Sequence, residues 1–252
     1  MPKNFTSVYR RVCSMSSDPE RVFKFKQFSL TDKASAMKIG MDAVLLGDLS
    51  AQTDFENALD IGCGCGILSL MIAQKGLGSV YAIDIDEGAA AEAAENFRNS
   101  PWAVRLNAEN ISIQAFAEKN RRKFDKIICN PPYFQNSLKS PKEGRNLARH
   151  NQSLTFFELA RAVARLISPN GHFDVILPFE SAEEMEKSMG REGLNLHSQM
   201  LIRNRAGEKP IRVIQHYTAN EQMGLKCNSL VIFDAEGTYS YQFTVFTKEY
   251  YL

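Results

Sequence analysis

A glycine-rich turn between an apolar strand and an apolar helix constrains the fold of this chain more than any other feature. Residues 60–66 read Asp-Ile-Gly-Cys-Gly-Cys-Gly, between a strand-like run at 57–61 and a helix-like run at 67–74. Glycines at alternate positions let the backbone turn tightly and approach a ligand without a Cβ in the way. The segment therefore predicts a strand, a ligand-binding turn and a helix, with GxGxG rather than GxGxxG spacing.

Short apolar runs continue to alternate with helix-like stretches after this turn. The strands expected next are residues 80–83, 124–129 and 172–177, and the helices are 87–99, 155–166 and 181–191, with Ser-Pro-Asn-Gly at 168–171 ending a helix. This alternation is typical of βαβ units and a mostly parallel sheet. Three later strand-like runs, at 196–202, 211–217 and 230–233, have no long helix between the first two, which predicts an antiparallel end to the sheet.

Acidic residues end the first two predicted strands. Asp60 ends the first, where its carboxylate can accept hydrogen bonds from a ligand ammonium group. Asp84 ends the second, 18 positions after Gly66. A carboxylate there can accept from both ribose hydroxyls of a nucleotide-like ligand, and NAD satisfies this as well as other nucleotides do. Asp86 and Glu87 are expected to be capping charges at the start of the next helix.

The tetrapeptide Asn130-Pro131-Pro132-Tyr133 follows the strand predicted at 124–129. Paired prolines lack backbone N–H groups and fix φ, so they hold a rigid loop at the carboxyl end of the sheet. The Asn130 side-chain oxygen and the Pro131 carbonyl can both accept hydrogen bonds from one amino group. Tyr133 offers a face for a planar base, a contact worth about 1–3 kcal/mol. Hydride transfer requires no such arrangement, so the motif favours chemistry at an amino group.

These motifs together resemble the class I methyltransferases that modify exocyclic amino groups. Four further segments resemble the bacterial family that methylates N6 of adenine 37 in a valine tRNA: Phe-Lys-Gln-Phe at 25–28, the segment 38–47, Ser-Pro-Trp at 100–102 and Tyr-Tyr at 250–251. The resemblance runs from about residue 22 to the C-terminus. The Asn-Pro-Pro-Tyr motif is specific for amino methylation, and the segment 25–47 points to this family in particular.

The resemblance implies an α/β fold with a Rossmann-like seven-stranded class I methyltransferase sheet, mostly parallel with an antiparallel C-terminal strand. It implies S-adenosylmethionine over the glycine turn and a flipped adenine against Asn130, Pro131, Pro132 and Tyr133 as catalytic residues. Residues 1–50 are expected to form an N-terminal extension that contributes to the cofactor and substrate site, and residues 51–252 the methyltransferase domain. The implied cofactor-binding residues are Gln27, Lys38, Asp42, Asp60, Gly62, Gly64, Asp84, Ser112 and Asn130.

One departure from the family pattern concerns the cofactor adenine. An acidic residue usually follows the third strand, where it binds the adenine amino group. This chain reads Asn-Ala-Glu-Asn-Ile-Ser at 107–112, with Ser112 in that place. Ser112 and Glu109 both stay candidates for this contact.

Composition limits the other properties that can be expected. Lys and Arg number 30 against 29 Asp and Glu, for a net charge of +1, so RNA binding must use a local basic patch. No apolar run approaches the roughly 20 residues of a membrane span. Five cysteines have no disulfide or zinc spacing, and the four histidines stand singly. We expect a cytoplasmic monomer that acts on tRNA, without a metal or a membrane.

Candidate RNA-binding residues come from two kinds of segment. The loop after Tyr133 is expected to border the substrate, and residues 1–20 look like a flexible arm. The candidates are Lys139, Lys142, Arg145, Arg149 and His150 in that loop, Arg10 and Arg11 in the arm, and Lys209 and Arg212 near the C-terminus, whereas the basic run at 119–123 is expected to be a solvated turn.

Other functions are compatible with parts of the pattern. A methyltransferase with the same tetrapeptide could act on ribosomal RNA or on a protein glutamine amide, although the glutamine enzymes carry a helical N-terminal domain for which residues 1–50 are too short. An inactive RNA- or nucleotide-binding module would be expected to lack Asp60, Asp84 or Asn130. An NAD-dependent dehydrogenase fits only the first two motifs.

Overall fold

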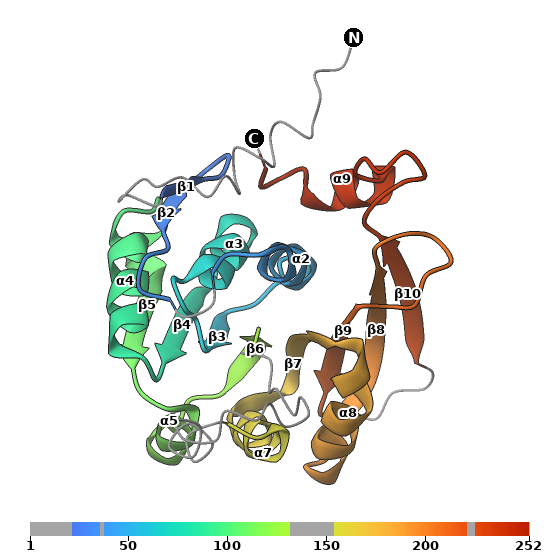
Figure 1. Ribbon diagram of the computed structural model, residues 1–252. Coiled ribbons are helices and arrows are strands. Elements are labelled where there is room, and N and C mark those ends of the chain that lie inside the picture. Colours follow the sequence, from blue (N-terminus) through green and yellow to red (C-terminus); the bar gives the residue numbers. More distant parts are fainter. Residues whose placement is uncertain (1–21, 36–37, 132–153, 221–224, 252) are drawn as a thin grey trace, which may run out of the picture.

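The computed structural model describes residues 22–35, 38–131, 154–220 and 225–251, and an eight-stranded sheet lies at its centre (Figure 1). Its strands are β3 (Asn57–Ile61), β4 (Ser79–Asp84), β5 (Leu106–Asn110), β6 (Phe124–Cys129), β7 (Ile167–Pro178), β8 (Asn195–Arg203), β9 (Arg212–Thr218) and β10 (Lys226–Val231). They lie in the order β10-β8-β9-β7-β6-β3-β4-β5. Among these strands only β9 is antiparallel to its neighbours, β7 and β8.

The predicted α/β class and the mostly parallel sheet are thus confirmed, but the strand count of seven is wrong. The strand-like runs named from the sequence number seven, and the strand that they lack is β5, which pairs in parallel with β4 at the edge of the sheet. The run at 230–233 corresponds to β10, which pairs in parallel with β8. The antiparallel strand is β9, which comes just before β10 in the sequence. Two other boundaries differ. The segment 168–171 lies inside β7, where the register with β6 shifts, and β10 covers residues 226–231 instead of 230–233.

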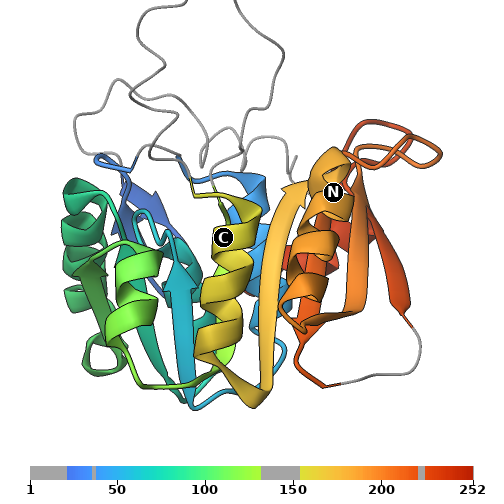
Figure 2. The ribbon, with the colours of Figure 1, turned by 90° about the horizontal axis from the view of Figure 1, so that it is seen from below.

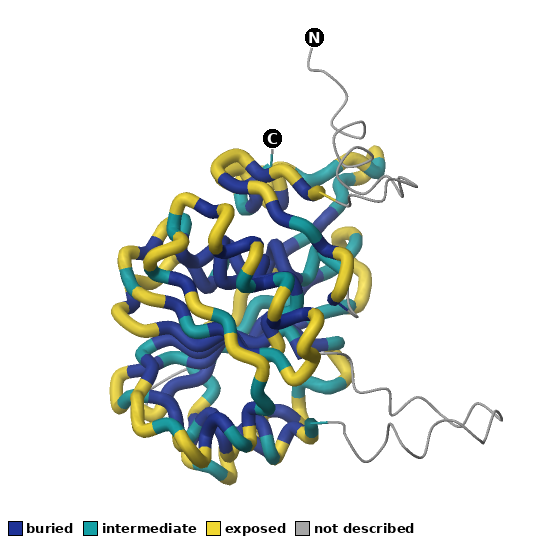
Figure 3. The backbone as a smooth tube through the Cα atoms, turned by 90° about the vertical axis from the view of Figure 1, so that its left-hand side faces the viewer, coloured by how far each residue is buried: buried dark blue, intermediate teal, exposed yellow. Residues whose placement is uncertain are grey.

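Helices cover both faces of the sheet (Figure 1). One face carries α2 (Met41–Ser50), α3 (Ile67–Lys75), α4 (Glu87–Arg98) and α9 (Tyr241–Thr247), and the other carries α5 (Ile113–Lys119), α7 (Phe156–Leu166) and α8 (Ala182–Arg191). Each face has its own apolar cluster, with Leu46 and Leu70 in the first and Leu59 and Leu166 in the second. Because both faces are covered, most residues of the central strands β3 and β6 are buried (Figure 3), including the charged side chains of Asp60 and Lys126.

The N-terminal hairpin packs against the C-terminal end of the chain. The hairpin consists of β1 (Val22–Lys24) and β2 (Ser29–Thr31). Phe25 stacks on Phe28 at 4.7 Å between ring centroids, Phe28 meets Trp102 edge-on at 5.8 Å, and Phe25 lies 6.3 Å from Tyr251. Three of the segments on which the family resemblance rests, 25–28, 100–102 and 250–251, therefore meet in one aromatic cluster.

The order of the strands predicts a ligand-binding crevice at one edge of the sheet. From β3 the chain moves outward through β4 to β5, whereas β6 and β7 lie on the other side of β3. Ligands of open α/β sheets bind at such a reversal, outside the carboxyl ends of the strands. Figure 2 shows these strands pointing toward a single edge, so the turns that follow β3, β4 and β6 are neighbours there.

Some expectations fall on segments that the structure does not describe. They concern the arm at residues 1–20 and the loop after Asn130-Pro131, with Pro132, Tyr133 and the basic residues up to His150. Among the described helices, none combines the length and the apolar character needed to cross a membrane.

Candidate active site

Three predicted site residues leave the sheet side by side. Ile61 of β3 pairs with Ile83 of β4 on one side and with Cys129 of β6 on the other. The residues that follow these partners are Asp84, Gly62 and Asn130, which therefore form a row along the carboxyl edge. Because neighbouring strands lie about 4.8 Å apart, the row is about 10 Å long.

The glycine turn in the middle of this row has a backbone that favours glycine. Gly62, Gly64 and Gly66 have φ of 69°, 54° and 84°. The N–H groups of Gly62 and Cys63 donate to the Ile83 carbonyl at 2.9 and 3.0 Å, which ties the turn to β4. A Cβ on Gly62 would meet no atom of the described structure within 4 Å. The turn therefore leaves open space where a ligand can approach its backbone.

Asp60 lies beneath the turn and is fully buried. Its Oδ2 accepts hydrogen bonds from the Ser69 N–H at 3.1 Å and the Ser69 hydroxyl at 2.7 Å, which fixes the carboxylate to the first turns of α3. Its Oδ1 is buried and has no hydrogen-bond partner among the described residues. Burial raises the pKa of Asp60 to about 7. The carboxylate thus keeps one acceptor oxygen for a ligand ammonium group, which would favour its charged form.

Asp84 is held in place by the two turns that flank it. Its Oδ2 accepts the Gly64 N–H at 2.9 Å, and its Oδ1 accepts the Asp86 N–H at 2.9 Å. Each carboxylate oxygen can accept a second hydrogen bond, so two vicinal hydroxyls can still bind. Asp86 accepts the Ala89 N–H at 2.8 Å and caps α4, as the sequence predicts.

The candidate adenine contacts separate in the structure. The Ile111 N–H donates to the Asp84 carbonyl at 3.0 Å, which brings the neighbouring Ser112 to the Asp84 side of the crevice. The Ser112 hydroxyl caps α5 by accepting the Ala115 N–H at 3.2 Å. Glu109 is an exposed residue inside β5, paired with Ile83. Ser112 thus lies nearer to the carboxyl edge than Glu109 does.

Ile85 is a further candidate residue of this site, and the sequence motifs did not point to it. It directly follows Asp84, and 68% of its surface is exposed although it is a large apolar residue. The Asn110 side chain donates to the Asp84 and Ile85 carbonyls, both at 3.0 Å, and fixes this turn. An apolar side chain beside a ribose-binding carboxylate can cover the face of a planar ring. A large apolar residue right after the acidic strand end was the available signal.

Asn130 completes the row at the end of β6. Its Oδ1 is buried and has no hydrogen-bond partner among the described residues, and Pro131 after it is also buried. A buried acceptor without a partner costs about 1–3 kcal/mol, so such an atom calls for an explanation. A ligand amino group in the crevice would supply the missing donor.

The remaining predicted cofactor residues make contacts within the protein. Lys38 donates to the Lys33 carbonyl at 2.9 Å and lies 3.5 Å from the Asp32 carboxylate. Asp42, in the first turn of α2, pairs with Arg212 of β9 at 2.9 Å.

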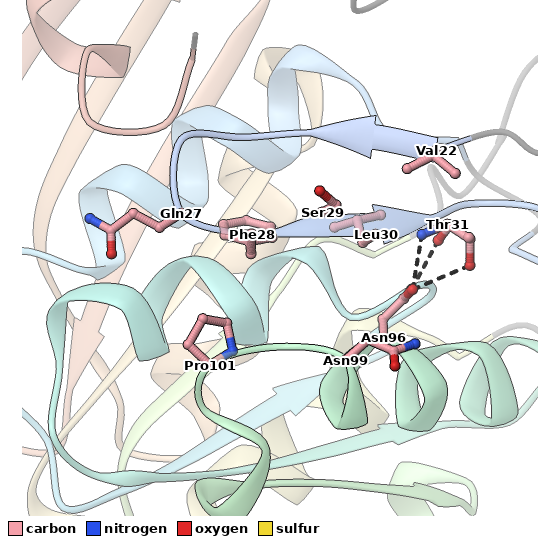
Figure 4. A pocket seen from close by; sticks show the side chains of 9 residues that line it. All are labelled: Val22, Gln27, Phe28, Ser29, Leu30, Thr31, Asn96, Asn99 and Pro101. Atoms are coloured by element: carbon pink, nitrogen blue, oxygen red, sulfur yellow. Dashed lines mark hydrogen bonds between the residues drawn. The ribbon is translucent and has the colours of Figure 1, made fainter.

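Gln27 lies apart from the row. It lines a pocket of about 400 Å³ together with Asn99 and Pro101, which follow the C-terminal end of α4 (Figure 4). Asn96, which lines the same pocket, donates to the Cys65 carbonyl of the glycine turn at 2.8 Å. This pocket therefore borders the glycine turn from the α4 side, and Gln27 stays a candidate for the site.

The cysteines near the turn are packing residues. Cys63, Cys65 and Cys129 are buried free thiols. Burial raises the pKa of all three, to about 12 for Cys65. These thiols are therefore neutral at physiological pH, which suits small apolar residues better than nucleophiles.

Comparison with known proteins agrees first on the class. A family model described as "Methyltransferase small domain" matches residues 35–155. A solved structure described as a predicted O-methyltransferase from Agrobacterium tumefaciens superposes with a TM-score of 0.64, at 19% identity, over 83% of this chain and 96% of that chain. The protein has the fold of the class I methyltransferases.

Sequence relatives then define the family. A protein of Bacteroides fragilis (strain YCH46) named tRNA1(Val) (adenine(37)-N6)-methyltransferase is 38% identical over 91% of this chain and 97% of its own length. A protein of the same name from Phocaeicola vulgatus is 39% identical over 93% of this chain and 99% of its own. The chain belongs to the tRNA1(Val) (adenine(37)-N6)-methyltransferase family, which confirms the resemblance inferred from its motifs.

Proposed function

We propose that this protein transfers a methyl group from S-adenosylmethionine to the exocyclic N6 of an adenine in tRNA, at position 37 of a valine tRNA. The relatives in its family are named for this reaction. The structural observation that carries the proposal is Asn130, whose buried side-chain oxygen lacks a partner among the described residues and stands beside the glycine turn.

The residues along the row fit S-adenosylmethionine. Asp84 has acceptor sites left for the two ribose hydroxyls, and Ile85 and Ser112 lie on the side where the adenine would sit. The open space at Gly62 admits the ligand, and Asp60 Oδ1 would accept from the amino group of the methionyl part. When bound, this cofactor supplies an electrophilic methyl group on a sulfonium centre.

Asn130 and Pro131 make the weakly nucleophilic N6 more reactive by orienting it. The lone pair of an aromatic amine is delocalised into the ring, so N6 attacks weakly. Hydrogen bonds from both N6 protons to the Asn130 side-chain oxygen and the Pro131 carbonyl favour a pyramidal nitrogen and aim its lone pair. Such positioning can supply about 7–11 kcal/mol of a barrier at most. No base is needed before attack, because a proton on N6 becomes acidic only after the N–C bond has formed.

Two further assignments accompany this mechanism. Pro132 keeps the loop rigid and Tyr133 stacks on a target adenine flipped out of the RNA; both lie outside the described residues. Residues 1–50 contribute to the site as an extension of the methyltransferase domain at 51–252. In support, Ser35 Oγ lies 3.3 Å from where a Cβ of Gly64 would be. The enzyme works as a cytoplasmic monomer.

Product identification tests the proposal. The protein is incubated with methyl-labelled S-adenosylmethionine and separate pools of tRNA, ribosomal RNA and protein, and labelled RNA is digested to nucleosides. The expected product is N6-methyladenosine from tRNA alone. Label in ribosomal RNA or on a glutamine side chain would instead assign the enzyme to one of the alternative substrates.

A further inference from the structure

A single buried side chain joins the N-terminal hairpin to the glycine turn. Asn96 of α4 is only 3% exposed. Its Nδ2 donates to the Cys65 carbonyl in the turn at 2.8 Å and to the Thr31 carbonyl in β2 at 2.9 Å. Its Oδ1 accepts the Thr31 N–H at 2.9 Å and the Thr31 hydroxyl at 3.2 Å (Figure 4). The amide of Asn96 thus fixes the position of the hairpin relative to the turn.

Glu92, one helical turn before Asn96, holds the residues that follow the hairpin. Its carboxylate accepts the N–H groups of Lys33 at 2.6 Å, Ala34 at 3.0 Å and Ser35 at 3.4 Å. Residues four positions apart lie on the same face of a helix, so Glu92 and Asn96 act on one continuous segment. We call this segment, residues 31–35, the strap.

The far end of the strap rests on the glycine turn. A Cβ placed on Gly64 would lie 3.3 Å from Ser35 Oγ, which is ordinarily too close, and one on Gly88 would lie 3.5 Å from the Ala34 Cβ. Gly64 is also the residue whose N–H binds Asp84. The strap therefore touches the same turn that orders the ribose-binding carboxylate.

Hydrogen bonds within the strap alone do not hold it in this place. Asp32 is fully buried and accepts the Ile39 N–H at 2.8 Å, which fixes the return of the chain toward α2. The contacts described above for the N–H groups of residues 33–35 are with a side chain of α4 and not with another strand. The position of residues 33–35 therefore depends on Glu92, which binds their N–H groups, together with Lys38, which donates to the Lys33 carbonyl at 2.9 Å.

We propose that Glu92 and Asn96 are positioning residues for the cofactor: they hold the strap against the glycine turn as one wall of the cofactor site. The inference rests on the proposed function, since it takes S-adenosylmethionine as the ligand of this turn. Its consequence is that cofactor binding and strap closure stabilise each other. A variant that leaves the strap closed for about a tenth of the time should bind cofactor about tenfold more weakly.

Two measurements on the full chain test this coupling. Calorimetry gives the Kd for S-adenosylmethionine, and hydrogen exchange gives the protection of amides 33–35 with and without cofactor. In the unmodified protein, cofactor should slow exchange at these amides. Glu92→Ala should expose them and raise the cofactor Kd and KM about tenfold, while kcat at saturating cofactor is kept. Glu92→Gln, which retains an acceptor oxygen, should restore much of the affinity.

Asn99→Ala is the matched control. Asn99 lies one residue past α4 and lines the same pocket as Asn96, but its side chain bonds Glu95. This variant should behave like the unmodified protein. Asn96→Ala should act as Glu92→Ala does; should it fail to fold, the half-buried Glu92 carries the test alone.

Two results would overturn the inference. One is an unchanged cofactor Kd in Glu92→Ala although amides 33–35 exchange freely, and the other is exchange at these amides that cofactor does not alter. Both leave the proposed function standing as long as the unmodified protein binds cofactor and methylates tRNA. If the unmodified protein binds no S-adenosylmethionine, the proposed function fails first.

Discussion

Replacing Asp84 with alanine tests whether this carboxylate binds the cofactor ribose or only stabilises the fold. The carboxylate accepts the backbone N–H groups of Gly64 and Asp86, and in our account both ribose hydroxyls as well. Charge-assisted hydrogen bonds contribute about 1.5–3 kcal/mol each. Loss of one bond at the lower value weakens cofactor affinity about tenfold, and loss of two at the upper value weakens it about 10⁴-fold. The freed Gly64 N–H adds a stability cost of about 1–2 kcal/mol.

Asp86→Ala is the control for this variant because it removes the same charge from the same turn. Asp86 caps α4 through the Ala89 N–H, and loss of such a cap costs about 1 kcal/mol. The two variants should therefore have similar melting temperatures, whereas only Asp84→Ala should lose cofactor affinity by calorimetry. Equal cofactor affinities for the two variants would refute the placement of the ribose at Asp84.

Three further variants probe the turn and the RNA surface. The pKa of Asp60 is raised to about 7, and a bound ammonium group favours its charged form, so cofactor affinity should increase from pH 6 to pH 8. Calorimetric titrations of Asp60→Asn over the same pH range should lack the part of this increase that comes from Asp60. Gly66→Ala would place a Cβ 2.5 Å from the Phe97 ring at a residue with positive φ. It should lower stability by about 1–3 kcal/mol more than Gly193→Ala, because Gly193 also has positive φ but no neighbouring atom within 4 Å of such a Cβ. Equal melting temperatures for the two variants would count against this packing. Arg205 and Lys209 are exposed residues of the loop between β8 and β9, which lies at the same edge of the sheet as the carboxyl end of β7. Charge reversal at both should weaken RNA binding. It should also lower the slope of log affinity against log salt concentration by about 0.7–0.9 per lost phosphate contact. Reversal at Lys119 and Arg121, which precede β6 at the opposite edge, should leave that slope unchanged.

The central row of the site could be predicted because each of its members ends a strand. Asp84, Gly62 and Asn130 each follow or end an apolar run of clear strand character, and a parallel sheet brings such ends to one edge. The local pattern therefore predicts both that a strand forms and that the residue lies at its carboxyl end. Ile85 is harder to find, because a single apolar residue at a turn gives no periodic signal; its place directly after the acidic strand end is the one cue in the sequence, and its exposure in the structure supports it.

Contacts between distant segments could not be predicted in this way. Asn96 looks like an ordinary polar position of a helix, and nothing in its neighbours shows that Thr31 and Cys65 share its amide. The pairing of Asp42 with Arg212 joins residues 170 positions apart. Such contacts depend on how the helices pack on the sheet. The hydrophobic periodicity of one segment does not predict which distant segment it contacts.

The histidines give the clearest example. They stand singly in the sequence, but three of the four lie together on β7, β8 and β9. His216 pairs with Asp174, its other nitrogen lies 3.1 Å from His172, and the His197 ring centroid is 5.5 Å away. The antiparallel insertion of β9 between β7 and β8 produces this cluster. Their separate positions in the sequence do not reveal this cluster, because only the order of the strands brings them together.

The central claim is that the Asn130 side-chain oxygen directs N6 toward the methyl group. Single-turnover methylation of a valine tRNA by Asn130→Ala, with cofactor and RNA affinities measured in parallel, tests it most directly. The rate should fall about 10²–10³-fold, as on loss of an oriented hydrogen bond at a reacting atom. Cofactor affinity should hold because Asp60, the glycine turn and Asp84 are untouched, and RNA affinity should hold because phosphate contacts dominate it. A rate near that of the unmodified protein would contradict the account, since Asn130 would then be no more than part of a turn.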